Sequence, residues 1–137
     1  MKRVRICLWV CAVLMAVSVS VFADEITDEY KKFMQPAAAA NMALQRIVAT
    51  DLAAAATNAG ELQAAFVKIE EFWTKRGTAD AIQFAKNVQQ VAKEVHDAAA
   101  AGNREATAAA ARRIGANCQG CHMAHRERLP DGSFLLK

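Results

Sequence analysis

The chain has 137 residues, enough for one domain, and its formal charge at pH 7 is +3. Three of its 17 lysines and arginines lie within the first five positions, so residues 24–137 hold 14 basic and 14 acidic residues and carry no net charge. This balance argues against a nucleic-acid-binding protein, because such proteins concentrate positive charge on one surface.

Residues 1–23 have the pattern of a cleaved secretory signal peptide. A basic start is followed by an uncharged apolar run, which ends at Ala23 in a small-residue cleavage pattern ahead of two acidic residues. The alternative is an uncleaved membrane anchor, but the run is slightly shorter than the roughly 20 residues that a spanning helix needs. We therefore expect export to the periplasm and a single mature domain of residues 24–137.

The mature chain predicts helices and no strand. Alanine, the strongest helix former, supplies 28 of its 114 residues, and Val, Ile and Thr never alternate with polar residues over a useful length. Apolar residues recur three or four positions apart in four stretches. These stretches cover about 27–49, from the cap candidate Thr50 to Gly77, about 79–101, and from the cap candidate Asn103 through Cys121.

Short connections between these stretches favour an all-α fold, an antiparallel up-down-up-down four-helix bundle. The segment "LPDG" at 129–132 predicts a turn, after which the last five residues can fold back. Phe66 and Trp73 are expected in the core, but large apolar residues are few, so we expect another group to fill the middle of the bundle.

The stretch "NCQGCHMAHRER" contains the attachment signature of c-type haem, Cys118-x-x-Cys121-His122. Residues three apart share one face of a helix, so the two thiols can reach two vinyl groups on one porphyrin edge. His122 would then lie beside the ring and offer a nitrogen to the iron. We expect one covalent haem c per chain.

The same residue types also occur in redox-active cysteine pairs, zinc sites and plain disulfides. A thioredoxin-type pair normally opens a helix after a strand, whereas this pair lies near the end of a helix. A zinc site would need Cys118, Cys121, His122 and His125, and four ligands so close in one helix do not readily surround a tetrahedral ion. A plain disulfide would leave the poor core unexplained.

A haem motif near the C-terminus, after four alanine-rich helices and an export signal, resembles the cytochrome c′ family and its low-spin c-556 relatives. The resemblance covers about residues 26–128 and rests on "CQGCHMAHR" and "YKKFMQPAAAANMALQ". It implies that Cys118 and Cys121 are the thioether anchors, that His122 is the proximal ligand, and that Arg126 lies near the haem on the proximal side.

In the six-coordinate relatives, a first-helix methionine binds the other face of the iron, and Met34 matches that position. Where the family often has an arginine and a lysine beside this methionine, this chain has Tyr30 and Gln35. Met34 adjoins the apolar stripe through Ala37, so its soft thioether can point inward. The alternatives are ordinary core packing of Met34 and ligation by Met42.

The leading expectation is an electron carrier with His122 and Met34 as axial ligands. The alternative is a five-coordinate protein that binds NO or CO, which applies if Met34 only packs. An enzyme is not expected, because the first helix offers no obvious proton shuttle for catalysis. Neither His96 nor His125 is expected to bind iron.

The expected partners are other exported or membrane-bound redox proteins, which would dock near Arg126 and Arg128. The resemblance also implies a possible homodimer through the first two helices.

Overall fold

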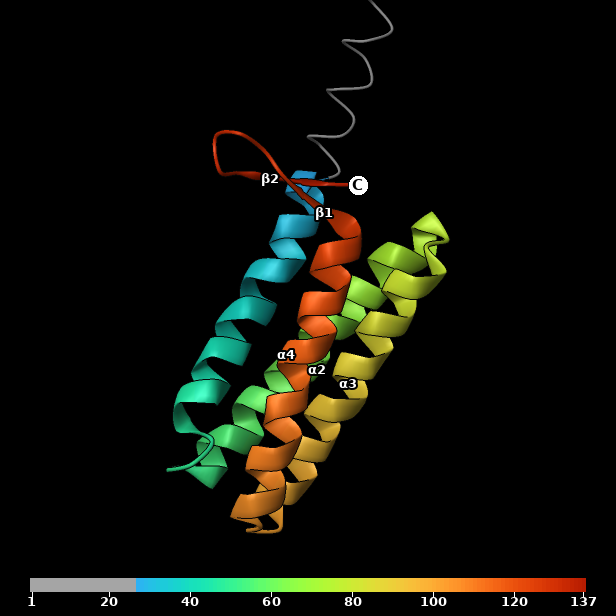
Figure 1. Ribbon diagram of the computed structural model, residues 1–137. Helices are drawn as coiled ribbons and strands as arrows, with labels where there is room; N and C mark the ends of the chain where they lie inside the picture. The colour runs from blue at the N-terminus through green and yellow to red at the C-terminus, as the bar shows by residue number, and fades with distance from the viewer. Residues whose placement is uncertain (1–26) are drawn as a thin grey trace, which may run out of the picture.

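The computed structural model describes residues 27–137, so the predicted signal peptide lies outside the described residues. It shows the predicted antiparallel four-helix bundle, in which successive helices run up and down (Figure 1). The helices are residues 27–47, α2 (Leu52–Arg76), α3 (Ala79–Ala100) and α4 (Arg104–His125). None of the described helices is both long and apolar enough to cross a membrane.

The start of α2 differs from the prediction by one residue. Asp51, rather than Thr50, is the N-cap, and its carboxylate accepts a hydrogen bond from the backbone N–H of Ala54 at 2.9 Å. The Thr50 hydroxyl instead donates to the carbonyl of Ile47 at 3.2 Å, in the turn that follows the first helix. Both residue types cap helices well, so neighbouring candidates cannot be separated by type alone.

The predicted stop signals at Gly77 and Gly102 and the predicted cap at Asn103 are confirmed, whereas the first helix ends at residue 47 and not at about 49. Gly77 ends α2 with a φ of 67°, in the left-handed region that glycine tolerates at a helix C-terminus. Gly102 follows α3 with a φ of 75°. Asn103 then caps α4, because its side-chain oxygen accepts from the N–H of Ala106 at 3.0 Å. These local signals fix the short connections that make neighbouring helices antiparallel.

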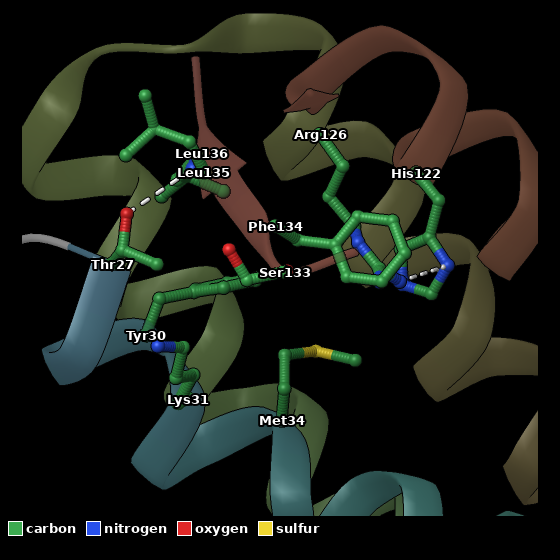
Figure 2. A pocket seen from close by; sticks show the side chains of 10 residues that line it. All are labelled: Thr27, Tyr30, Lys31, Met34, His122, Arg126, Ser133, Phe134, Leu135 and Leu136. Atoms are coloured by element: carbon green, nitrogen blue, oxygen red, sulfur yellow. Dashed lines mark hydrogen bonds between the residues drawn. The ribbon is translucent and has the colours of Figure 1, made fainter. Parts of the chain in front are cut away.

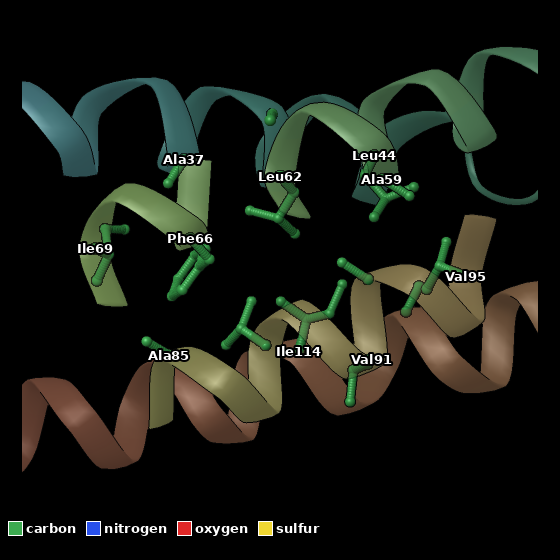
Figure 3. Packing of buried hydrophobic residues seen from close by; sticks show 14 of the residues in the cluster. Ala37, Leu44, Ala59, Leu62, Phe66, Ile69, Ala85, Val91, Val95 and Ile114 are labelled. Carbon is green, nitrogen blue, oxygen red and sulfur yellow. The ribbon is translucent and has the colours of Figure 1, made fainter. Parts of the chain in front are cut away.

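Side chains from all four helices fill the middle of the bundle (Figure 3). The largest fully buried residues include Leu44, Leu62, Ile69 and Ile114, and buried alanines between them let the helices approach closely. The middle of the bundle is thus filled by the protein's own side chains, and the expectation that another group fills it is wrong. The free volume lies at one end, where the first helix begins and α4 ends.

The prediction that the chain contains no strand is wrong at the C-terminus. β1 (Arg126–Arg128) and β2 (Phe134–Leu136) form an antiparallel hairpin at one end of the bundle (Figure 1). Strands of three residues are too short to show an alternating pattern, so only the turn between them was visible in the sequence. That predicted turn is confirmed, with Gly132 at a φ of 86°.

The hairpin is attached to the start of the first helix and to the end of α4. The backbone N–H of Leu136 donates to the hydroxyl of Thr27 at 3.1 Å, and that of Lys137 donates to the carbonyl of His125 at 3.1 Å. The C-terminal segment therefore joins the first helix to the end of α4, where the haem motif lies.

Candidate functional site

The two cysteines lie on the inner side of α4, one turn apart. Both are free thiols and half-buried. Together with His122 they border a nearly closed crevice of about 10 Å³ between the helices. Its other lining residues are Tyr30, Met34, Phe66, Ile69, Ala81, Phe84, Ala85, Val88 and Asn117. The predicted arrangement of two thiols on one helix face is therefore present.

Gly120 allows α4 to lie close to α3 between the two cysteines. A Cβ atom at this position would lie 2.7 Å from Cε1 and 3.0 Å from Cζ of the Phe84 ring. Gly115, one turn earlier on the same helix, has no such neighbour within 4 Å. Gly120 thus has a packing role that Gly115, the other glycine of α4, lacks.

This difference predicts opposite effects of two Gly→Ala substitutions. Gly115→Ala is expected to raise the free energy of unfolding by about 0.5–1 kcal/mol, because alanine is the better helix former. Gly120→Ala gains the same propensity but must displace the Phe84 ring, and overpacking costs about 1–3 kcal/mol. Urea unfolding followed by circular dichroism measures both changes. Equal stabilisation by the two variants would show that the close approach has no energetic consequence.

Burial keeps both thiols protonated at neutral pH. Burial first, and then the neighbouring Cys118 and Asp80, raise the pKa of Cys121 to about 11 against the opposing effect of a hydrogen bond with Tyr30. Burial also raises the pKa of Cys118. The thiolate is the reactive form of cysteine. Without a group attached, these thiols are therefore protected rather than activated.

Slow alkylation of the haem-free protein is the expected consequence. A pKa of about 11 for Cys121, against an ordinary 9.0, leaves about 100-fold less thiolate at pH 8. Iodoacetamide should therefore modify Cys121 far more slowly in the folded protein than in urea, as mass spectrometry of the tryptic peptide can show. Equal rates in the two states would mean that α4 does not shield the thiol.

A larger pocket of about 290 Å³ adjoins the crevice, between the first helix, the end of α4 and the hairpin. Met34 reaches into it from the first helix, and His122 borders it from α4 (Figure 2). Tyr30, Met34 and His122 line both the pocket and the crevice. The remaining lining residues are Thr27, Lys31, Arg126, Ser133, Phe134, Leu135 and Leu136. The structure thus brings the predicted ligand residues to one space.

His122 is held as a neutral imidazole. Partial burial lowers its pKa, and the positive charge of Arg126 lowers it further. The Nη1 atom of Arg126 lies 3.1 Å from Nδ1 of His122, and a guanidinium can only donate, so Nδ1 is the acceptor. A neutral imidazole is the form that binds metal ions. Arg126 therefore lies beside the predicted proximal ligand, as the resemblance implies.

The hairpin contributes a wall that the sequence did not reveal. The Phe134 ring lies against Arg126, whose guanidinium carbon is 3.7 Å from the ring centroid. Ser133, Leu135 and Leu136 complete this side of the pocket. The only sequence signal for this contribution was the "LPDG" turn, which brings the last residues back toward α4.

Tyr30 occupies the position where the family often has an arginine, and it is buried. Its ring contacts Phe72 at 4.9 Å and Trp73 at 5.4 Å between centroids. Burial raises the pKa of Tyr30 far above its usual range, so it remains a neutral phenol. The adjacent Trp73 Nε1 is buried and has no hydrogen-bond partner among residues 27–137. Tyr30 and Trp73 therefore place an O–H and an N–H within an otherwise apolar cluster.

Several other residues that the sequence singled out lie outside the pocket. Met42 is 55% exposed and Met123 is 69% exposed, so neither faces the space that Met34 enters. His96 is exposed on α3. Nε2 of His125 lies 3.0 Å from a carboxylate oxygen of Asp80, and the His125 ring contacts the Trp73 ring in a tilted arrangement. Of the methionines after residue 26, Met34 is the one that the pocket includes.

No group of three or more Cys, His, Asp or Glu side chains within residues 27–137 is close enough to hold a metal ion. Cys118, Cys121, His122 and His125 are thus not arranged as a zinc site. No protein-family model matches the chain, and neither the curated proteins nor the solved structures contain a match. The resemblance to the cytochrome c′ family therefore rests on the residues of the chain alone.

Proposed function

We propose that this protein is an exported c-type cytochrome of the c′ and c-556 type, which carries electrons on one covalently bound haem. The supporting observation is that Met34 and His122 border one pocket from two different helices. Cys118 and Cys121 lie on the turn of α4 that leads to His122. The haem motif and the predicted sixth ligand are therefore neighbours, although they are far apart in the sequence.

The residues present fit this group chemically. Two free thiols one turn apart match the two thioether bonds of haem c. His122 supplies an imidazole nitrogen and Met34 a soft sulfur, which are the axial ligands of low-spin cytochromes. Because Nδ1 of His122 accepts from Arg126, the ring hydrogen lies on Nε2, so iron binding by Nε2 requires that this hydrogen leave Nε2. The crevice beside them is lined mainly by aliphatic and aromatic side chains, which suit a porphyrin face, but its volume of about 10 Å³ means that these side chains must move apart to admit the ring. The donor set thus contains each element that covalent six-coordinate binding needs.

Bound at this site, haem c would supply an iron centre that gains and loses one electron. Cys118 and Cys121 would fix it to α4, so that it cannot be lost after export. Met34 would favour the reduced iron and raise the reduction potential. The hairpin would cover one side of the pocket beside Met34 and His122, while Arg126 keeps the imidazole from taking up a proton.

We assign no catalytic reaction to this site. Tyr30 is the polar first-helix residue that borders both the pocket and the crevice. Its raised pKa keeps the phenol protonated, so it is not a general base near neutral pH. Gln45, another polar residue of this helix, donates instead to the carbonyl of Ala111 at 3.1 Å.

A second candidate function is binding of NO or CO by a five-coordinate iron. It is favoured by the free volume of about 290 Å³ beside Met34, which has a largely apolar lining. In this case Met34 would pack in the wall and leave the sixth position open to a small neutral gas.

A ferric absorption spectrum of the matured protein decides between the two functions. Electron transfer requires a low-spin spectrum with a methionine–iron charge-transfer band, and the ferrous protein should then bind CO weakly. A high-spin ferric spectrum with ready CO binding would support the gas-binding function instead. A colourless protein would exclude both.

A further inference from the structure

A second, shallow pocket lies along the outer side of the last turn of α4. It has a volume of about 390 Å³ and is lined by Gln119, His122, Met123, Arg126, Arg128 and Phe134. Two apolar side chains here are open to solvent, Met123 at 69% and Phe134 at 40% exposure. We call Met123, Arg126, Arg128 and Phe134 the docking face. It adjoins His122 and shares Arg126 and Phe134 with the pocket of about 290 Å³ beside Met34, which we call the inner pocket.

The positive charge of the docking face is not neutralised. Within residues 27–137, no carboxylate forms an ion pair with Arg126 or Arg128. Glu127 lies between them in β1, but successive strand residues point to opposite faces. α4 has no acidic residue after Glu105. An otherwise neutral domain therefore carries a local positive charge beside its haem motif.

Arg126 is also held in place by the Phe134 ring, and Arg128 lies at the outer limit of contact with the same ring. The guanidinium carbons of the two arginines lie 3.7 Å and 6.0 Å from the centroid of the Phe134 ring. Stacked guanidinium groups lose less conformational freedom when they bind, and their planar fork matches a carboxylate. Arginine, methionine and aromatic residues are enriched in the centres of protein interfaces. The docking face combines all three residue classes.

We propose that the docking face binds a partner protein through an acidic, carboxylate-rich surface. Arg126 and Arg128 would pair with carboxylates of that surface, and Met123 would fill an apolar depression in it. The idea that an electron crosses at this face rests on the proposed function, whereas the docking itself rests on the charge and exposure of these residues. The partner is thereby defined by its charge and not only by its redox role.

An anionic membrane is a different candidate, and a binding experiment separates the two. The isotope-labelled, haem-bearing protein is titrated with a short poly-glutamate peptide while its NMR spectrum is followed. The proposal predicts shifts confined to residues 119–128 and 133–136, with affinity that falls as salt is added. Tighter binding to phosphatidylglycerol vesicles than to the peptide, or shifts centred elsewhere, would overturn it.

Two arginine-to-glutamate substitutions, one within the docking face and one outside it, provide a matched comparison. Arg128→Glu changes the docking face, whereas Arg112→Glu changes an exposed position of α4 outside it. Both give the same net charge. Arg128→Glu is expected to weaken peptide binding at least tenfold, a change of about 1.4 kcal/mol, and Arg112→Glu less than about twofold. Equal weakening would show that overall charge, and not this face, determines binding.

Electron exchange provides a second measurement that depends on the haem. Hexacyanoferrate(III), an anion, accepts one electron from the reduced protein and becomes hexacyanoferrate(II). Arg128→Glu should slow this reaction at low salt and Arg112→Glu should not. If the protein carries no haem, this reaction is absent while peptide binding persists, so the proposed function fails and the docking face stands. If the reaction occurs but both variants bind the peptide normally, the docking face fails alone.

Discussion

Replacement of Met34 by alanine is expected to convert the ferric protein from low-spin to high-spin. Met34 is the methionine that the inner pocket includes, and it borders that pocket together with His122. Loss of its thioether removes the sixth ligand, so the charge-transfer band disappears and the open position binds CO. The reduction potential should fall by on the order of 100 mV, since axial ligands set haem potentials over about 0.8 V.

Met42→Ala is the matched control for this substitution. Met42 lies on the same helix but is 55% exposed, so its removal should leave both the spectrum and the potential unchanged. Visible absorption and redox titration measure the two variants side by side. A low-spin spectrum retained in Met34→Ala would show that Met34 only packs. A change of the spectrum or the potential in Met42→Ala instead would show that Met42, and not Met34, is the sixth ligand.

Removal of both mature cysteines, in Cys118→Ala/Cys121→Ala, is expected to abolish covalent haem. The two thiols are the residues of the mature chain that can form thioether bonds, because the remaining cysteines lie in the predicted signal peptide. Each single variant should keep one bond and shift the pyridine haemochrome band to longer wavelength. Stained gels after acid extraction, which removes non-covalent haem, report the loss.

Cys7→Ala/Cys11→Ala serves as the control for that experiment, since both positions belong to the predicted signal peptide. It should leave the haem content unchanged as long as export continues. Covalent haem that persists in Cys118→Ala/Cys121→Ala would rule out the assigned attachment site. A lower haem content in the control, with export unchanged, would show that Cys7 or Cys11 takes part in haem attachment.

The sequence was sufficient for the helices because their signals are local. Gly77 and Asn103 act through their own backbone preference and side-chain reach, so both were identifiable from residue type. Helical periodicity likewise separates Met34 from Met42, because Met42 lies two residues from each of the buried Ala40 and Leu44 and so faces away from the core.

The parts of the site that depend on tertiary contacts were not predictable in the same way. Phe134 reaches the pocket only because a short hairpin returns the chain to α4, and three-residue strands leave no periodic signal. The unpartnered indole nitrogen of Trp73 depends on how its neighbours pack, which residue type does not reveal. Likewise, the arginine stacking on Phe134 depends on strand register.

The central claim is that Cys118 and Cys121 bind haem covalently, and intact-mass spectrometry tests it most directly. The protein is produced in a host competent for cytochrome c maturation, unfolded, and treated with iodoacetamide. The account predicts a coloured chain beginning at residue 24, heavier by one haem, with no thiol left to alkylate. A colourless, fully helical chain of apoprotein mass that takes up two carbamidomethyl groups would contradict it.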